Sequence, residues 1–185
     1  MALKNLTPFS YLTLVKKTTD PNRFIFRPAF LSSLSEVELK EAKKKLLKAA
    51  AWLKSFKLPK KARFTFQEWG QHMGGMEHAP EANDFCGTSG CAIGWFAMKG
   101  NFGFKSTWID GHIQINDIDL TADDSLPLMF ESAGVQFGLT KDAAEFLFSP
   151  YPNTTLAKAD ASKEDVATQM EFVATTGIFP TLMMV

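Results

Sequence analysis

The sequence predicts a single α+β domain over residues 1–185, dominated by helices and carrying one β-hairpin at about 103–117. Apolar residues recur at helical spacing in several segments that open with a capping residue. The segment 103–117 instead has β-rich flanks on both sides of Asp110-Gly111, which is typical of a tight hairpin turn. A chain of 185 residues with 45% hydrophobic and 22% charged residues suffices for one domain with a sizeable core.

The most regular helix is predicted over about residues 35–57. Ser35 and Glu38 form a capping-box pair, in which the serine side chain accepts from a helix amide and the glutamate reaches back. Leu58-Pro59 ends the helix. Apolar residues at alternating spacings of three and four define its buried face: Leu39, Ala42, Leu46, Ala49, Leu53 and Phe56.

A second group of elements precedes the hairpin. We predict a short helix over residues 64–69 and a loop over 70–87, where four glycines and a proline discourage regular structure. A helix then covers about residues 89–99, with Thr88 or Ser89 as its cap.

Two helices follow the hairpin, over about residues 126–137 and 140–148. Gly138 separates them, and Thr140 caps the second one. The pair is expected to form a helical hairpin that contributes seven residues to the core: Leu126, Met129, Phe130, Ala133, Phe137, Phe146 and Leu147.

The last helix is predicted from Ser162, which pairs with Asp165 in a capping box, to about Thr176. Gly177 ends it. The apolar tail, residues 178–185, is expected to tuck into the core.

The net charge of zero hides a strong asymmetry. Residues 1–63 carry 15 Lys/Arg and 4 Asp/Glu, a net of +11, whereas residues 64–185 carry 5 and 16, a net of −11. One interpretation is a basic surface for an acidic partner, and the other is that the basic segment packs on the acidic remainder or has a solvated face. The apolar stripe of the helix at 35–57 leaves six lysines for solvent, and these are the candidate partner-binding residues: Lys40, Lys43, Lys44, Lys48, Lys54 and Lys57.

The partner expected on this face is an acidic protein surface rather than a nucleic acid. The charges are mostly lysines, which lack the planar fork of arginine. The two helices over 126–148 have the outline of a helix-turn-helix, but the second carries Asp142 and Glu145 and would repel phosphate.

The two cysteines of the chain lie in the segment from Cys86 to Trp95, with the sequence Cys-Gly-Thr-Ser-Gly-Cys-Ala-Ile-Gly-Trp. Two cysteines in a chain of this length are not a disulfide framework, so free thiols in a reducing cytoplasm are expected. Apolar neighbours surround Cys91, which predicts a buried, structural thiol. The spacing also allows a disulfide between Cys86 and Cys91.

The pattern Cys-Gly-Thr-x-x-Cys-x-x-Gly-Trp resembles a motif in small uncharacterised bacterial and phage proteins. A second similar element runs from Phe137-Gly-Leu-Thr140 through Ala143, Ala144, Phe146, Leu147 and Phe148. The resemblance covers roughly residues 64–150. That family has no assigned activity, so the resemblance implies a bacterial or phage source and no catalytic residue.

One chemical alternative is a cysteine-dependent hydrolase. Cys91 would fall in the first turn of its helix, where free amides and the helix dipole favour the thiolate. A cysteine at a helix start followed by a histidine on a strand, here His112, is the order that papain-like hydrolases use. Cys86 is the other candidate nucleophile.

The second chemical alternative is a metal site. His72, His78, Cys86 and Cys91 are residues of the types that zinc binds, but their spacing lacks the usual close pairs. We therefore predict no bound metal and no cofactor.

The sequence thus favours a non-enzymatic protein that binds a macromolecular partner in the cytoplasm. No apolar run approaches the roughly 20 residues of a membrane span, so no membrane association is expected. The N-terminal segment 1–15 is interrupted by polar residues and a proline, unlike a signal peptide. Nothing in the sequence specifies an oligomeric state.

Overall fold

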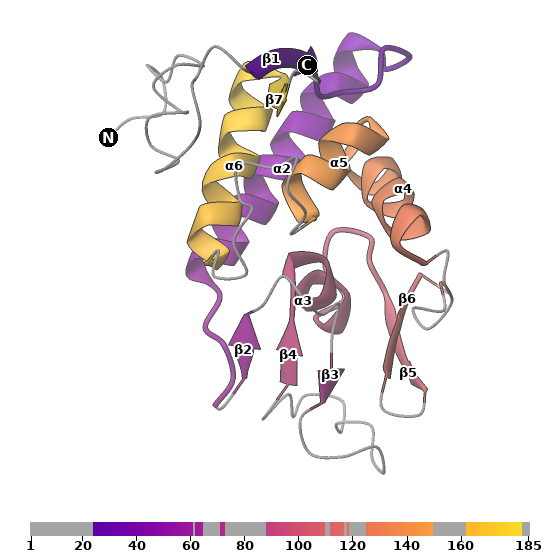
Figure 1. Ribbon diagram of the computed structural model, residues 1–185, viewed down its shortest axis with the longest axis vertical. Helices are drawn as coiled ribbons and strands as arrows, with labels where there is room; N and C mark the ends of the chain where they lie inside the picture. Colours follow the sequence, from indigo (N-terminus) through magenta and orange to yellow (C-terminus); the bar gives the residue numbers. More distant parts are fainter. Residues whose placement is uncertain are drawn as a thin grey trace.

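The computed structural model describes residues 24–60, 62–64, 71–72, 88–109, 112–116, 118, 125–149 and 162–182. Within these ranges, four helices form one layer, a small sheet forms another, and a short helix lies between them (Figure 1). The helices are α2 (Glu36–Ser55), α3 (Ala92–Met98), α4 (Ser125–Phe137), α5 (Lys141–Phe148) and α6 (Lys163–Thr176). The predicted class, α+β and mainly helical, is confirmed.

The larger sheet has the strand order β2-β4-β3-β6-β5. Its strands are short: β2 (Arg63–Phe64), β3 (Gln71–His72), β4 (Thr88–Gly90), β5 (Ser106–Ile109) and β6 (His112–Ile115). β2 and β4 run parallel, and the other neighbours are antiparallel.

The predicted hairpin is the β5–β6 pair. Ile109 lies opposite His112, so two residues connect the strands, as a tight turn requires. Asp110 and Gly111 themselves lie outside the described residues.

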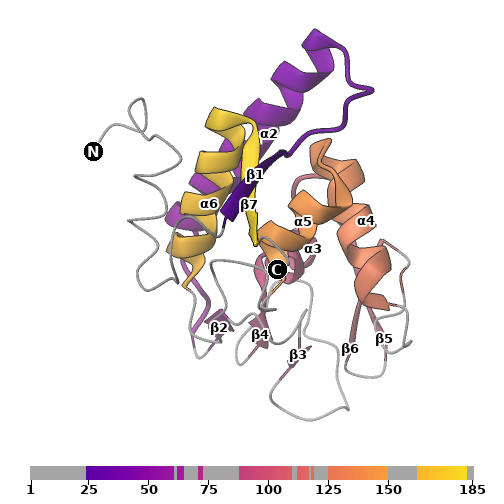
Figure 2. The same cartoon turned by 45° about the horizontal axis from the view of Figure 1, so that its top comes forward.

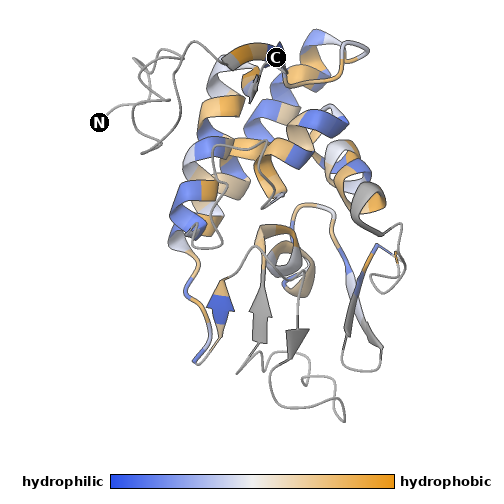
Figure 3. Cartoon of the chain, in the orientation of Figure 1, coloured by the Kyte–Doolittle hydropathy of each residue, from blue (hydrophilic) through white to orange (hydrophobic). Residues whose placement is uncertain are grey.

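Helix α2 packs along α6, and Figure 2 shows the two side by side from a second direction. The predicted capping box is confirmed: the amide of Glu38 donates to Ser35 Oγ at 3.3 Å, and Glu38 Oε2 accepts from the Ser35 amide at 2.9 Å. Of the predicted apolar stripe, Leu46, Ala49 and Leu53 are fully buried, whereas Leu39, Ala42 and Phe56 are half-buried. Ala50, which the stripe did not include, is also fully buried. Helices α2, α4, α5 and α6 carry both hydrophobic and hydrophilic residues (Figure 3), as expected of elements with one face toward a core.

The predicted ends of the later helices are also confirmed. Thr140 Oγ1 accepts from the amide of Ala143 at 3.2 Å, and Ser162 forms a capping box with Asp165. Gly138 and Gly177 adopt the left-handed conformation, with φ of 66° and 76°. Of the seven predicted core residues in α4 and α5, six are buried; the side chain of Leu126 lies outside the description.

Aromatic rings connect the helical layer to α3. All seven residues of α3 are buried, and the ring of Phe96 lies within 6.2 Å of the rings of Trp52, Phe102 and Phe137. The core is therefore one continuous cluster that reaches from α2 and α6 through α3 to Ile115 of β6.

A second, two-stranded sheet joins distant parts of the sequence. β1 (Phe24–Pro28) pairs antiparallel with β7 (Ile178–Leu182). The segment after β1 continues the connection: the amide of Ala29 donates to Gly177 O at 2.9 Å, and the carbonyl of Ala29 accepts from Thr140 N at 2.9 Å. Neither strand was predicted. The expected burial of the tail is confirmed at Phe179, which is 3% exposed.

The predicted start of the helix at 89–99 is wrong. Thr88 and Ser89 belong to β4, and α3 begins only at Ala92, with Cys91 as its N-cap. Pairing of β4 with β2 and β3 holds Thr88–Gly90 extended, so neither polar residue is available as a cap. The predicted short helix at 64–69 mostly lies outside the described residues, and Phe64 ends β2.

Candidate functional site

Cys91 is a buried structural thiol, as predicted. Its side chain is 3% exposed, and its sulfur accepts from the amide of Gly94 at 3.5 Å. Burial raises the pKa of the Cys91 thiol to about 11. At neutral pH this thiol is therefore protonated and inaccessible, the opposite of what a nucleophile needs.

The strand register separates His112 from β4, the strand that leads to Cys91. Gln71 of β3 lies between Ser89 of β4 and His112 of β6, so two strand spacings, about 10 Å, separate Ser89 from His112. His72 lies opposite Thr88, beside the strand that leads to Cys91. The side chains of both histidines, and Cys86 and His78 entirely, lie outside the description. Among the residues described, no three or more of His, Cys, Asp and Glu gather as metal ligands.

The six candidate lysines fall into different environments. Lys40, Lys44, Lys48 and Lys57 are exposed. Lys43 is half-buried, with Nζ 5.8 Å from the centre of the Phe30 ring. Lys54 binds the acidic segment, since its Nζ lies 2.6 Å from the Glu171 carboxylate. A lysine outside the candidate set, Lys163 of α6, also joins the two segments, because its Nζ donates to Leu53 O at 2.8 Å.

Lys40, Lys44 and Lys48 form one exposed face within the predicted site. Because these residues are four apart, their side chains form one stripe along α2. The buried residues of α2 lie on its other side, so the stripe faces solvent. Within the described part of the chain, Glu41 is the acidic residue that pairs with this stripe, through Lys44 at 3.3 Å.

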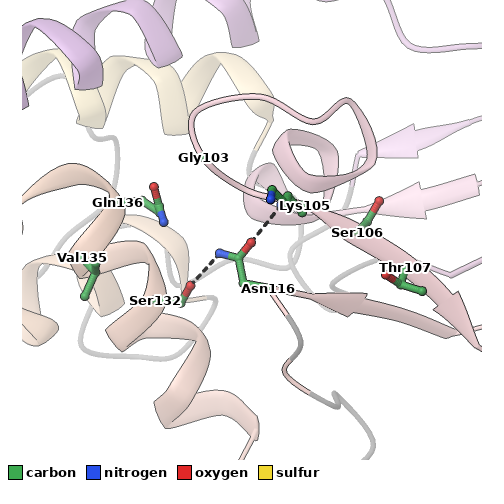
Figure 4. Close-up of a pocket in the computed structure, with 8 residues that line it drawn as sticks. All are labelled: Gly103, Lys105, Ser106, Thr107, Asn116, Ser132, Val135 and Gln136. Atoms are coloured by element: carbon green, nitrogen blue, oxygen red, sulfur yellow. Dashed lines mark hydrogen bonds between the residues drawn. The ribbon is translucent and has the colours of Figure 1, made fainter.

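A polar hollow of about 590 Å³ lies between the hairpin and α4 (Figure 4). The side chain of Asn116 joins the two sides of this hollow: Oδ1 accepts from the amide of Lys105 at 2.9 Å, and Nδ2 donates to Ser132 Oγ at 3.0 Å. Asn116 also has a left-handed φ of 51°, a conformation that asparagine tolerates better than most residues. The lining residues are Gly103, Lys105, Ser106, Thr107, Asn116, Ser132, Val135 and Gln136.

A second hollow of about 400 Å³ lies on the other side of α4, against α2. It shares Val135 and Gln136 with the first, and on the α2 side it is lined by Glu38, Glu41, Ala42, Lys44, Lys45 and Lys48. The two hollows therefore adjoin at Val135 and Gln136 of α4, and the second of them reaches the lysine stripe. We call this adjoining pair of hollows the α4 channel.

Lys45 is the charged residue that sequence reasoning missed. Its Nζ donates to Gln136 Oε1 at 3.3 Å and lies 5.6 Å from the centre of the Phe137 ring. Burial lowers the pKa of Lys45. The only signal in the sequence was its position in the run Lys43-Lys44-Lys45, where a helix of 3.6 residues per turn must place one lysine toward a neighbouring element.

No family model, curated protein or solved structure matches this chain. The resemblance of the segment from Cys86 to Trp95 to bacterial and phage proteins stays a prediction. No described helix combines the length and the apolar character that crossing a bilayer demands.

Proposed function

We propose that this chain is a non-catalytic cytoplasmic protein, of bacterial or phage origin, that binds an acidic surface of a partner protein through α2. The observation that carries the proposal is the exposed stripe of Lys40, Lys44 and Lys48 on a helix whose opposite face is buried in the core. A rigid helix that presents three cations at regular spacing attracts an acidic partner over a distance of about 10 Å.

An acidic protein suits this face better than a nucleic acid does. The stripe contains lysines only, which attract phosphate as point charges and do not read bases as arginine does. The large hydrophobic side chains that α2 exposes are aliphatic, Val37 and Leu47, so α2 presents no exposed ring on which a base could stack.

The alternative is a cysteine-dependent hydrolase using Cys91 or Cys86 with His112, and the burial of Cys91 argues against the form of it that uses Cys91. A thiol with a pKa of about 11 is not a nucleophile at neutral pH. Its unpaired state also suits a reducing compartment.

The test compares the wild type with the triple variant K40E/K44E/K48E. The probe is a fluorescein-labelled oligoglutamate peptide, followed by anisotropy at increasing salt. We expect wild-type binding that weakens steeply with salt and no binding by the triple variant, because exposed charges contribute little to stability but much to attraction.

The matched control is R27E/K60E/K141E, which makes the same change in net charge at exposed residues away from the stripe. It should bind almost as the wild type does. Equal loss in both variants would mean a general charge effect, and unchanged binding by K40E/K44E/K48E would overturn the proposal. A single-stranded DNA oligonucleotide bound more tightly than the peptide would shift the assignment to nucleic acid.

A further inference from the structure

Within the described part of the chain, Lys45 forms no salt bridge. Two carboxylates line the same hollow, but both are engaged elsewhere. Glu38 accepts from Ser35 in the capping box, and Glu41 pairs with Lys44. The acceptor for Lys45 is the neutral amide oxygen of Gln136, at 3.3 Å. A partly desolvated ammonium group bonded to a neutral acceptor gains more from a carboxylate than an exposed one does.

The wall of the α4 channel opposite α2 is also cationic and polar. None of the eight residues that line the larger hollow is acidic, and Lys105 is exposed there. Ser106, Thr107 and Ser132 supply hydroxyl groups that donate to carboxylate or backbone oxygens. Figure 4 shows Lys105 and Ser132 on either side of Asn116, whose two side-chain hydrogen bonds join the hairpin to α4. The wall is therefore held by both elements.

The middle of the channel combines an apolar side chain with a fixed amide. Val135 is 77% exposed, an unusual position for a valine in a helix that buries Met129, Phe130, Ala133 and Phe137. The side chain of Gln136 lies against the backbone of Gly103, where an added Cβ would collide with it. Lys45 and Gly103 therefore hold Gln136 from two sides, beside the exposed valine.

From this arrangement we infer that the α4 channel takes an extended acidic segment of the partner protein, with one carboxylate on Lys45 and one apolar side chain on Val135. The inference rests on the proposed function and adds the place and the chemistry of recognition. The lysine stripe attracts the partner, and the channel, about 590 Å³ on one side of Gln136 and about 400 Å³ on the other, selects the segment that fits.

The test uses a fluorescein-labelled peptide of alternating glutamate and valine, with the full chain, and two pairs of matched variants. Val135→Glu and Val37→Glu each place a carboxylate on a helix surface where the valine is more than 70% exposed, 77% and 73%. We expect V135E to weaken binding about tenfold and V37E about twofold or less. Glutamate is a better helix former than valine, so neither variant should unfold.

The second pair removes one positive charge each. Lys45→Met keeps an unbranched side chain but removes the ammonium group that lies 5.6 Å from the centre of the Phe137 ring, and it should weaken binding about tenfold, whereas Lys40→Met should weaken it about twofold. In NMR spectra of the ¹⁵N-labelled protein, the backbone amide chemical shifts of Lys105, Ser132 and Gln136 should change when the peptide is added. Equal effects within each pair, with shifts confined to Lys40, Lys44 and Lys48, would overturn the channel and leave the proposed function standing. No binding of either peptide to the wild type would overturn both.

Discussion

The backbone amide of Ala29 donates a 2.9 Å hydrogen bond to the carbonyl of Gly177, and thereby joins the start of the described chain to the end of its last helix. The carbonyl of Ala29 accepts from Thr140, and Leu31 N donates to Gly138 O at 3.0 Å. One extended segment thus ties together two helix ends, each made by a glycine with positive φ. The left-handed conformation of these glycines therefore ends two helices and also positions their carbonyls to accept hydrogen bonds from the segment after β1.

Replacing Gly138 by alanine should destabilise the fold by about 2 kcal/mol or more, and replacing Gly177 by about 1 kcal/mol. Both residues have left-handed φ, but an added Cβ at Gly138 would lie 3.0 Å from Leu34 Cδ1 and 3.1 Å from Ala42 Cβ. At Gly177 the nearest atom is the flexible Lys43 Nζ, at 3.6 Å. Urea denaturation measures the difference. Equal losses would show that the crowding around Gly138 relaxes at no cost.

Replacing Lys54 by methionine should destabilise the protein by about 1–2 kcal/mol, because it leaves a mostly buried carboxylate without its cation. The side chain of Glu171 is only 12% exposed, and that of Lys54 is 40% exposed. The matched control is Lys44→Met, whose partner Glu41 is 62% exposed, and its cost should be below about 0.5 kcal/mol. Thermal unfolding of both variants checks the prediction, and a larger loss in K44M would contradict it.

The buried thiol of Cys91 should make stability fall at high pH. The pKa is raised to about 11 in the folded state from an ordinary value of 9.0, so the folded protein keeps a proton that the unfolded chain has lost in this window. The contribution of this proton to the free energy of unfolding is fully present below about pH 9 and is lost as the pH rises toward 11. The total loss is about 2–3 kcal/mol.

Cys91→Ser isolates this contribution because serine retains an N-cap acceptor but does not titrate in the window. The free energy of unfolding of the wild type and of C91S is measured by urea denaturation from pH 7 to 10.5. The wild type should lose stability relative to C91S above pH 9. Parallel curves would show that the folded thiol ionises as readily as the unfolded one.

Asn116 should contribute through both its side chain and its backbone conformation. Asn116→Gly removes the bonds to Lys105 N and Ser132 Oγ but suits φ of 51°, and should cost about 1 kcal/mol. Asn116→Ala removes the same bonds and adds backbone strain, and should cost about 1 kcal/mol more. Denaturation midpoints of the two variants test the order, which is the reverse of ordinary helix or strand preferences.

Helices with local signals could be predicted from the sequence, whereas pairings between distant segments could not. Ser35 with Glu38, Thr140, and Ser162 with Asp165 define three helix starts within four residues each. β1 and β7 carry no such signal, since each is five residues long, contains a proline, and becomes a strand only by pairing across about 150 residues of sequence.

The candidate site shows the same division. The lysine stripe follows from one helical period and was predicted, but the α4 channel is assembled from α2, α4 and the hairpin. Lys45, Asn116 and Gln136 are 20 or more residues apart and share no motif. The N-cap of α3 was predicted at Thr88 or Ser89, because these residues are better caps than Cys91. Both residues pair within the sheet as part of β4, so the helix begins after them and Cys91 is its cap.

The pairing of β1 with β7, and of α2 with α6, has a consequence for synthesis of the chain. As the polypeptide leaves the ribosome, α2 emerges more than 100 residues before the helix that covers its apolar face. Because α6 cannot cover Leu46 and Leu53 before it has been synthesised, these residues stay accessible to chaperones until then. A nascent chain stalled before residue 163 should therefore stay unfolded and bind a chaperone. A nascent chain with a C-terminal linker long enough to bring residue 182 out of the ribosome tunnel should fold and dissociate from the chaperone.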